Sequence, residues 1–499
     1  MNQTDPRNSS SRKGLLGRIL GLGGTPRAAE PLIVPRAEHE ISRKQMAEEV
    51  LKVLYRLHNQ GHKAYLVGGA VRDLLLGREP KDYDVSTDAR PDQMKELFVN
   101  SRLIGRRFRL AHIVFKGGRV VEVSTFRRRP DPPDEEADED GEKDLLIGED
   151  NTWGTPQEDA YRRDFTINAL FYNIADFSVI DYVGGLADLK AKVVRTIGAA
   201  DIRFREDPVR MMRAVEYAAR LGFDLHPEVR KAIQKHRKDL RRASVARVAD
   251  ELSNLLKCGS AESAFREMWN LGLLEILYQD LHNALGNGQA DRFLSDLAYA
   301  DRRTGEGRPL RDVPLLAMFF LPALREAVAS AEAKKGGRLS KGEFLVNVER
   351  ILDESQPLFQ IPNRRRHQIK QAVLAARKMR RLPSRHRGLA SLVERAYFLD
   401  SLNLLEVEVE TSGEHESVLK EWGDLKAEAQ REGRLIDPEE RDRRGRRGRG
   451  DRGRRRERSG RGRRGEGPDD RKDSREREKD RPSRKDGEED RGRGQRRDR

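Results

Sequence analysis

The segment LVGGAVRDLLLG, residues 66–77, and the KDYDVS after it, residues 81–86, restrict the fold more than any other part of the chain. A short apolar run, AYLV, leads into Gly68-Gly69, and the spacing of residues 70–76 predicts a helix that ends at Gly77. YDVS then has the composition of a second strand. This order predicts a mixed α/β unit in which the second strand returns beside the first.

Asp82 and Asp84 are separated by one residue in the predicted second strand. Alternate residues of a strand share a face, so the two carboxylates would lie close together and raise each other's pKa. A bound divalent cation removes this repulsion, and carboxylate oxygens with room for water and phosphate suit Mg²⁺. Two such ions can clamp the attacking and leaving oxygens of a phosphoryl transfer. A lone D-x-D is common, and its simpler interpretation is the solvated face of an edge strand.

The residues upstream favour the phosphoryl-transfer interpretation. At Gly68 and Gly69 no side chain intervenes, so backbone N–H groups can approach a triphosphate closely. Arg72, in the first turns of the predicted helix, could reach the same phosphates. The glycine pair alone is a weak signal, whereas strand, glycine pair, helix and D-x-D in this order form a specific one.

The remaining patterns predict an α+β protein with a catalytic head at 46–200. A helix with apolar residues at helical spacing begins near Gln45, and two strand-like runs, 111–115 and 119–126, flank Gly117-Gly118 as in a hairpin. Beyond Asp201 the pattern is helical to about Arg431. We therefore expect a mixed-sheet head, a helical neck at 201–260 and a helical RNA-binding body at 261–436.

The two ends and one internal segment have a different composition. Residues 1–45 are rich in Ser, Gly, Pro and Arg and predict a flexible leader, and residues 130–150 carry eleven Asp or Glu and predict a mobile acidic loop. The tail, residues 437–499, has 27 Lys or Arg against 18 Asp or Glu and no aliphatic or aromatic side chain. It predicts a disordered basic segment, interpreted either as an electrostatic tether for RNA or as a solubilising tail.

The overall charge points to a polyanion partner. The 499-residue chain has a net charge of +15 and a sequence pI near 9.8, which favours nucleic acid or an anionic membrane surface. A single cysteine, Cys258, excludes a disulfide framework and suits a reducing cytoplasm. No apolar run approaches the ~18–20 residues of a membrane span. The N-terminal GLLGRILGLGG would support at most a weak peripheral membrane contact.

Three further motifs complete a family resemblance. LVGGAVRDLLLG with KDYDV, then YRRDFTINAL at 161–170, DYVGGLADL at 181–189 and REDPVRMMRAVEYAARLGF at 205–223 resemble, in order, the motifs of the class II nucleotidyltransferases of the polymerase-β type. That family contains the CCA-adding tRNA enzymes and the bacterial poly(A) polymerases. The resemblance is dense over residues 45–260 and implies a polymerase-β-like head.

The resemblance also implies roles for site residues. Asp82 and Asp84 would hold Mg²⁺, and Asp164 would belong to the catalytic set, with Glu122 as a rival third carboxylate. Gly68, Gly69, Arg72 and Arg163 would hold the triphosphate of ATP, with Asn168 assisting at the sugar.

The helix after Glu206-Asp207 is similar to the family's base-selecting helix. We expect Asp207 to cap it, with Pro208 at its first position. Asp207 accepts and Arg210 donates hydrogen bonds, so together they match the amino group and ring nitrogen of adenine or cytosine. This pair by itself therefore leaves A and C open.

Other residues favour a poly(A) polymerase that adds AMP from ATP to RNA 3′ ends and promotes RNA processing and decay. LIGRRFRLAHIVF, residues 103–115, resembles a segment of that branch, and Arg106, Arg107 and Arg109 add positive charge. Expected partners are RNA 3′ ends, ATP and RNA-decay proteins in the cytoplasm. The alternatives are a CCA-adding tRNA nucleotidyltransferase and, in another class, an inactive RNA-binding scaffold.

Overall fold

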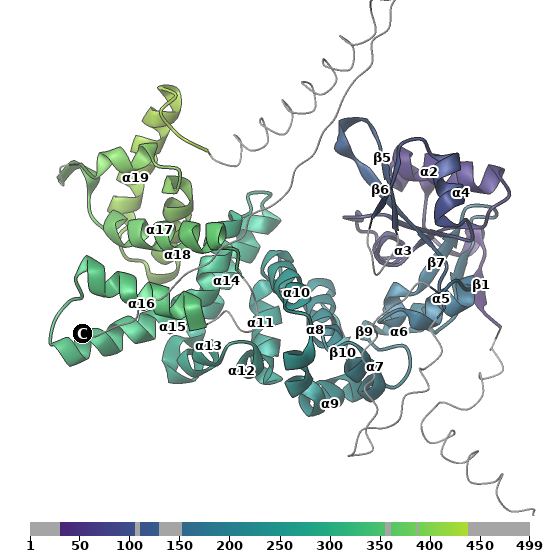
Figure 1. Ribbon diagram of the computed structural model, residues 1–499, viewed down its shortest axis with the longest axis horizontal. Helices are drawn as coiled ribbons and strands as arrows, with labels where there is room; N and C mark the ends of the chain where they lie inside the picture. Colours follow the sequence, from purple (N-terminus) through teal and green to yellow (C-terminus); the bar gives the residue numbers. More distant parts are fainter. Residues whose placement is uncertain (1–29, 105–109, 129–151, 355–360, 386–387, 438–499) are drawn as a thin grey trace, which may run out of the picture. The chain divides into compact units, whose positions relative to one another are not determined.

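The computed structural model describes residues 30–104, 110–128, 152–354, 361–385 and 388–437 (Figure 1). Most of the leader, Arg106, Arg107 and Arg109, the acidic loop 130–150 and the tail beyond residue 437 lie outside these residues.

Eight strands form one mixed sheet in the head. Their order is β1-β8-β7-β2-β3-β6-β5-β4; β3 and β6 run parallel, and the other neighbours are antiparallel. The hairpin predicted around Gly117-Gly118 is confirmed as β5 and β6. The strands are β1 (Leu32–Val34), β2 (Ala64–Val67), β3 (Asp84–Thr87), β4 (Ser101–Ile104), β5 (Leu110–Val114), β6 (Val120–Thr125), β7 (Leu170–Asn173) and β8 (Val179–Asp181).

The two faces of this sheet differ in composition. One face packs apolar residues such as Leu66, Val85 and Val123 into a core against α2 (Glu48–Asn59) and α4 (Pro91–Leu97). On the other face, at the centre of the sheet, lie the polar Asp84 and Glu122. Helix α5 (Pro156–Arg162) covers part of this second face through the buried Ala160. The polar part of this face is where the predicted site residues gather.

Residues 30–45 differ from the flexible leader that their polar composition predicts. Strand β1 pairs with β8 and completes the edge of the sheet, with Leu32 opposite Asp181. His39 contacts the backbone oxygen of Phe177 through its Nε2 at 2.8 Å. Three consecutive strand-forming residues, LIV, are enough to extend the ladder, although the segment around them is rich in polar residues.

Strand β3 begins at Asp84, so Asp82 precedes the ladder instead of lying within it. The physical reason is the neighbouring strand: β2 ends at Val67, the partner of Asp84, and Gly68 then turns the chain away with φ 71°. Tyr83 and Asp82 therefore have no strand partner on the β2 side. Asp84 therefore lies in a strand, as predicted, whereas Asp82 lies just before that strand.

Between Asp201 and Arg431 the described residues are nearly all helical, as predicted. A two-stranded parallel ladder of β9 (Val193–Val194) and β10 (Asp224–Leu225) accompanies it. The remaining helices are α3 (Gly69–Leu75), α6 (Gly185–Ala191), α7 (Ala200–Glu206), α8 (Arg210–Leu221), α9 (Pro227–His236), α10 (Val245–Lys257), α11 (Ala261–Asn270), α12 (Leu273–Leu277), α13 (Gln279–Ala284), α14 (Ala290–Gly305), α15 (Asp312–Lys335), α16 (Lys341–Glu354), α17 (Asn363–Met379), α18 (Phe398–Ser412) and α19 (Glu416–Arg431).

Helix α15 is the apolar segment that sequence reasoning did not single out. By length and composition alone it could cross a membrane, but 56% of its apolar stretch is buried inside the protein. It contacts α13, α14, α16, α17 and α18. We interpret it as the core helix of the helical part, with Arg325 on α15 donating to the buried Asp296 on α14 at 2.8 Å.

Candidate active site

Gly68 lies at the centre of the predicted site. A Cβ atom at this position would lie 3.1 Å from Arg163 Nη1 and 4.0 Å from Asp84 Oδ2. The left-handed φ of 71° also disfavours any side chain. The turn between β2 and α3 therefore requires glycine, and the space above it lies between a guanidinium and a carboxylate.

Asp84 and Glu122 are direct partners in the parallel pair of β3 and β6, so their side chains share a face. Asp84 lies at the surface, yet many protein atoms surround its carboxylate. This loss of solvation raises the pKa of Asp84; the Arg163 guanidinium opposes the rise, and the Glu122 and Asp82 carboxylates add to it. The predicted repulsion between carboxylates is thus present, and Glu122 contributes to it together with Asp82.

Arg163 is held beside Gly68 by a residue that sequence reasoning missed, Asp159. Both Nε and Nη2 of Arg163 donate to Asp159 Oδ2, at 3.2 and 3.0 Å, and Arg162 Nε donates to Asp159 Oδ1 at 2.9 Å. The Asp159 side chain is fully buried. Burial raises its pKa, but pairing with Arg163 and Arg162 outweighs burial and leaves the pKa below its ordinary value. The spacing of three and four residues on one helix was the available signal.

The carboxylate of Asp164 is occupied by protein partners. Arg213 on α8 donates to Asp164 Oδ2 through Nε at 2.9 Å and Nη2 at 2.7 Å. The Phe165 N–H and Asn168 Nδ2 donate to Oδ1 at 2.8 and 3.3 Å. Burial raises the pKa of Asp164, but the Arg213 pair and the hydrogen bonds bring it below its ordinary value. This geometry ties the head to the neck and does not favour Asp164 over Glu122 as the third metal-site carboxylate.

Arg72 is buried, whereas the sequence suggested a phosphate contact. Its Nε donates to Asp73 Oδ1 at 2.8 Å, and Nη1 donates to Asn168 Oδ1. The guanidinium also lies over the Tyr217 ring, 5.3 Å from the centroid. A contact between Arg72 and the triphosphate stays a prediction, and the observed contacts do not favour it. Arg72 instead holds Asn168 in position.

The two members of the predicted base-reading pair lie near each other, but each is held more closely by other residues. Asp207 and Arg210 approach only to 3.9 Å, while Arg247 on α10 donates to both Asp207 oxygens at 2.7 Å. Arg210 instead donates to Glu206 Oε2 and to the Arg203 carbonyl, both at 3.1 Å. Asp207 also ends α7 and does not cap α8, which begins at Arg210, two residues after Pro208. Sequence reasoning missed Arg247 because it lies forty residues along the chain.

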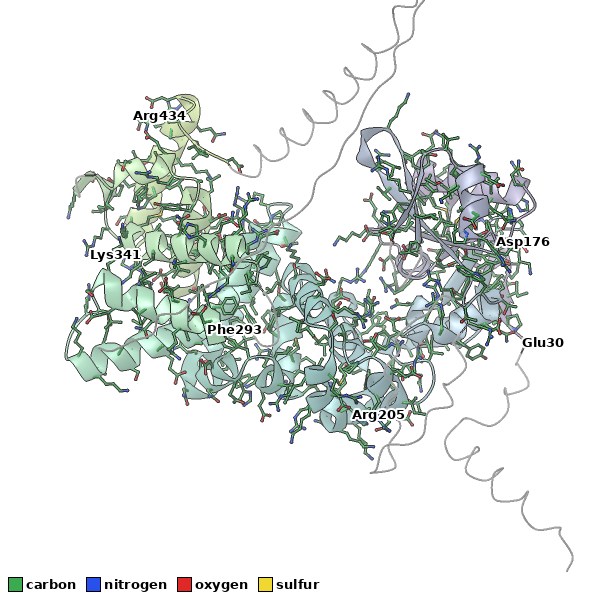
Figure 2. The ribbon with its side chains drawn as sticks, in the orientation of Figure 1. Glu30, Asp176, Arg205, Phe293, Lys341 and Arg434 are labelled. Carbon is green, nitrogen blue, oxygen red and sulfur yellow. The ribbon has the colours of Figure 1, made fainter. Side chains whose placement is uncertain are left out.

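Arg203 on α7 connects this region to the arginine pair of α5. Its Nη2 donates to the backbone oxygens of Arg162, at 2.7 Å, and of Arg163. Its Nη1 donates to Glu206 Oε2 at 2.6 Å. Arg203 is almost fully buried, and Figure 2 marks its neighbour Arg205 on the same helix. The end of α5 and the start of the base-reading region are therefore bound to each other through one side chain.

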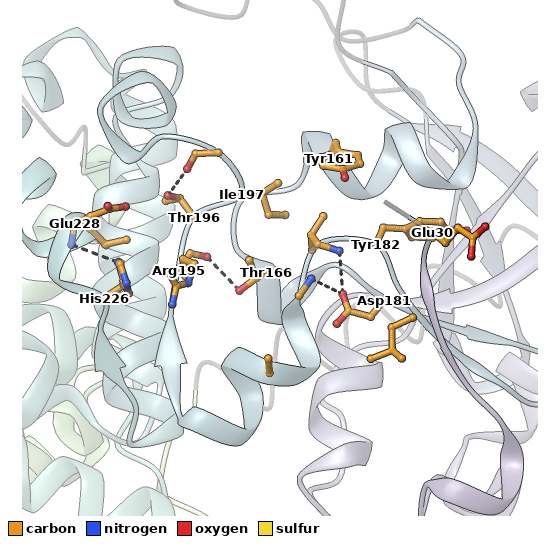
Figure 3. A pocket seen from close by; sticks show the side chains of 16 residues that line it. Glu30, Tyr161, Thr166, Asp181, Tyr182, Arg195, Thr196, Ile197, His226 and Glu228 are labelled. Carbon is orange, nitrogen blue, oxygen red and sulfur yellow. Dashed lines mark hydrogen bonds between the residues drawn. The ribbon is translucent and has the colours of Figure 1, made fainter. Parts of the chain in front are cut away.

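A cavity of about 570 Å³ lies elsewhere in the described residues (Figure 3). Tyr161, Tyr182, Arg195 and His226 line it, and none of the predicted site residues does. Asp181 at its wall is already saturated, since its oxygens accept from the N–H groups of residues 183–186 at 2.9–3.0 Å. This cavity is separate from the site around Gly68.

Family comparison matches two segments of the chain. Residues 64–195 match the poly A polymerase head domain. Residues 222–285 match a domain described as the probable RNA and SrmB-binding site of polymerase A. The first segment contains Gly68, Asp84, Glu122 and Arg163, and the second contains Arg247.

Relatives and solved structures agree with this match. Poly(A) polymerase I of Salmonella typhimurium is 38% identical over 408 residues, covering 80% of this chain and 86% of that protein. The CCA-adding enzyme of Bacillus pumilus is 38% identical over a shorter stretch, 46% of this chain and 54% of that protein. The structure of the Bacillus stearothermophilus CCA-adding enzyme in complex with CTP is similar with a TM-score of 0.53 and 25% identity, covering 77% of this chain and 83% of that one. The chain therefore belongs to the poly(A) polymerase family of class II nucleotidyltransferases.

Proposed function

We propose that this protein adds AMP from ATP to RNA 3′ ends without a template, releasing pyrophosphate. The observation that carries the proposal is the set of groups around Gly68: the Arg163 guanidinium lies on one side, and the paired Asp84 and Glu122 lie on the other. Phosphoryl transfer requires cationic groups that bind the triphosphate and, next to them, carboxylates that bind a metal ion.

We propose that Asp82 and Asp84 bind Mg²⁺. Among the described residues, no three acidic, His or Cys side chains are close enough to form a complete metal site. The carboxylates alone are therefore an incomplete set, which fits an ion that keeps water and takes further oxygens from a triphosphate. Burial is the main cause of the raised pKa of Asp84; Arg163 opposes the rise, and the neighbouring Glu122 and Asp82 carboxylates add to it. Mg²⁺ would supply charge neutralisation and polarise the phosphate oxygens.

The protein's own groups would hold the triphosphate in a fixed position. Gly68 and Gly69 let the backbone approach it, and Arg163 donates from a guanidinium already aligned by Asp159. The RNA 3′ hydroxyl oxygen forms a bond to the α-phosphorus as the bond to pyrophosphate breaks. We propose Glu122, the exposed partner of Asp84, as the acceptor of the hydroxyl proton.

Base selection would depend on Asp207, Arg210 and Arg247. Arg247 fixes the plane of the Asp207 carboxylate, and each carboxylate oxygen keeps a further lone pair for a base amino group. Arg210 is held by Glu206 and the Arg203 carbonyl. A base pocket with its polar groups bound in advance tolerates fewer base orientations. The choice of adenine over cytosine is supported by the longer match to poly(A) polymerase I.

The first test is incorporation of single nucleotides into an unstructured RNA primer. We expect repeated addition with ATP and little with CTP, GTP or UTP, and we expect Asp84→Ala to abolish addition. Robust CTP incorporation into a tRNA lacking its 3′ end would instead favour the CCA-adding activity named for the shorter-matching relatives. Full tailing by Asp84→Ala would contradict the metal-site assignment.

A further inference from the structure

A row of four ionisable residues crosses the open face of the sheet. In the strand registers, Arg102 on β4 is opposite His112 on β5, His112 is opposite Glu122 on β6, and Glu122 is opposite Asp84 on β3. Directly paired residues share a face, so all four side chains lie on the face that carries the proposed metal site. The charge along the row changes from acidic at Asp84 to basic at Arg102.

The burial pattern shows that this face is accessible at β4, β5 and β6. In β6 the residues on the side of Glu122 are exposed or half-buried, whereas Val121 and Val123 on the other side are buried. In β5 His112 is half-buried between the buried Ala111 and Ile113. The helices α2 and α4 pack on the opposite, apolar face. Among the described residues, the row is therefore accessible to a large ligand.

The contacts within the row leave its basic end available. His112 Nε2 lies 3.2 Å from Glu122 Oε1, with side-chain exposures of 23% and 47%. Arg102 is exposed, and among the residues that the structure describes no hydrogen bond or ion pair engages its guanidinium. His112 thus contacts Glu122, and Arg102, on the strand beyond His112, is a donor without an acceptor among the described residues.

The geometry of the reaction assigns a ligand to this end. In an in-line displacement the attacking oxygen lies opposite the leaving group. The leaving pyrophosphate belongs on the side of Gly68 and Arg163, because that is where the cationic donors lie. The attacking 3′ hydroxyl must then approach from the other side of Asp84, which is the side of Glu122, His112 and Arg102.

We propose that Arg102 and His112 bind the last phosphodiester of the RNA primer and so place its 3′ hydroxyl beside Glu122. Adjacent strands lie about 4.8 Å apart, so the backbone at His112 lies about 10 Å from that at Asp84. Arg102 is one strand beyond His112, so its long side chain can reach a phosphate that lies above His112, while the 3′ hydroxyl of the same nucleotide extends on toward Glu122. This inference rests on the proposed function, since it takes RNA as the acceptor.

A chemically neutral linkage tests the contact. A labelled RNA whose last phosphodiester is a methylphosphonate would be compared with unmodified RNA, by fluorescence anisotropy, in the presence of a non-hydrolysable ATP analogue. The unmodified protein should bind the neutral primer about tenfold more weakly, because one charge-assisted contact is lost. Arg102→Ala should bind both primers equally, at the weaker level, and His112→Ala should show a reduced difference. An equal penalty in the unmodified protein and in Arg102→Ala, or no penalty in either, would overturn the proposal.

Two controls make the result specific. Arg119→Ala removes an exposed arginine from the same hairpin, but Arg119 pairs with Glu49 on α2 and lies outside the row, so its primer discrimination should match that of the unmodified protein. When the methylphosphonate is placed several linkages upstream, the unmodified protein and Arg102→Ala should show the same difference in affinity between the neutral and the unmodified RNA.

In steady-state tailing, Arg102→Ala should raise the KM for RNA and leave the KM for ATP unchanged. If the unmodified protein does not tail RNA with ATP, the proposed function fails; if it tails but Arg102→Ala leaves the RNA KM unchanged, only this inference fails.

Discussion

The charged side chains on the two sides of Gly68 have different neighbours: on one side they face opposite charges, and on the other side a carboxylate lies beside another carboxylate. On the side of α5, Arg163 is matched by the buried Asp159, and nearby Asp164 is matched by Arg213. On the side of β3 and β6, Asp84 lies beside Glu122, a group of the same charge. Burial acts on both carboxylates. At Asp159 the two arginines outweigh it and the pKa is lowered, whereas at Asp84 burial raises the pKa, Arg163 opposes the rise, and Glu122 and Asp82 add to it.

We infer that the arginine–carboxylate pairs near α5 keep their geometry without a ligand, whereas the carboxylates of β3 and β6 need a bound cation. A charge with its counter-charge in place contributes to stability and holds its geometry without help. Two carboxylates with no cation between them cost stability and gain it back only on binding. Residues of the first kind should therefore respond to mutation in stability, and residues of the second kind in activity.

The largest effect is expected at Asp84. Asp84→Asn removes a proposed metal ligand and should lower kcat by about 10³-fold or more. The pKa of Asp84 is raised in the folded state. Ionisation of Asp84 therefore destabilises the folded state, and this cost appears as the pH rises from the ordinary pKa of Asp to the raised one. The variant should thus unfold at an equal or higher temperature at pH 7, and lose this advantage near pH 4. Asp92→Asn, at an acidic position on α4, is the control and should change neither quantity. A marked loss of stability in Asp84→Asn would contradict the comparison.

Asp159→Ala should act mainly on stability. It leaves two partly buried arginines without their counter-ion and should cost about 3 kcal/mol of unfolding free energy, measured by urea denaturation. Arg163 would also lose its alignment, so the KM for ATP should rise. Asp159→Glu, which keeps the charge, should recover part of the stability. If Asp159→Ala is fully stable, Asp159 does not hold the arginine pair as inferred.

Glu251 tests the same reasoning in the neck. Arg213 binds Asp164 at 2.7 Å and approaches Glu251 only to 3.9 Å. Burial raises the pKa of Glu251 to about 7, with Arg213 opposing and Glu216 adding to the rise. The folded state then holds a proton that the unfolded state has lost, so stability falls as pH rises from about 4 to about 7. Glu251→Gln should remove this decrease and add about 2 kcal/mol at pH 8, seen in thermal unfolding across pH 5–9. An unchanged pH profile would contradict the assignment.

The smallest of these effects is expected at Arg247. Arg247→Ala frees the Asp207 carboxylate to rotate, so the KM for ATP should rise about tenfold and the preference for ATP over CTP should fall. Single-nucleotide incorporation kinetics measure both quantities. Arg242→Ala, at an arginine a few residues earlier in the chain, provides a matched comparison. If Arg247→Ala keeps full discrimination, the carboxylate does not need this arginine for base selection.

Local sequence pattern was sufficient for the elements that carry the site. The strand–glycine–helix unit at Gly68 and the hairpin at Gly117-Gly118 both depend on residues within a few positions of each other. Backbone conformation and side-chain periodicity are short-range properties, so a sequence specifies them directly. The same pattern left one element out: strand β1 forms from three residues because β8 offers it a free edge.

Tertiary structure decided which charges meet. Arg247 reaches Asp207 across forty residues, Arg213 reaches Asp164 across forty-nine, and Glu122 lies opposite Asp84 because β6 runs parallel to β3. Side-chain spacing along the chain carries no signal for such pairs. The sequence likewise provided no signal that Arg72 would be buried and bonded to Asn168. The sequence by itself thus identified the residues able to do phosphoryl-transfer chemistry. Only the folded chain sorted them into neutralised pairs and the adjacent carboxylates of Asp84 and Glu122, because electrostatic partnership depends on distance in space.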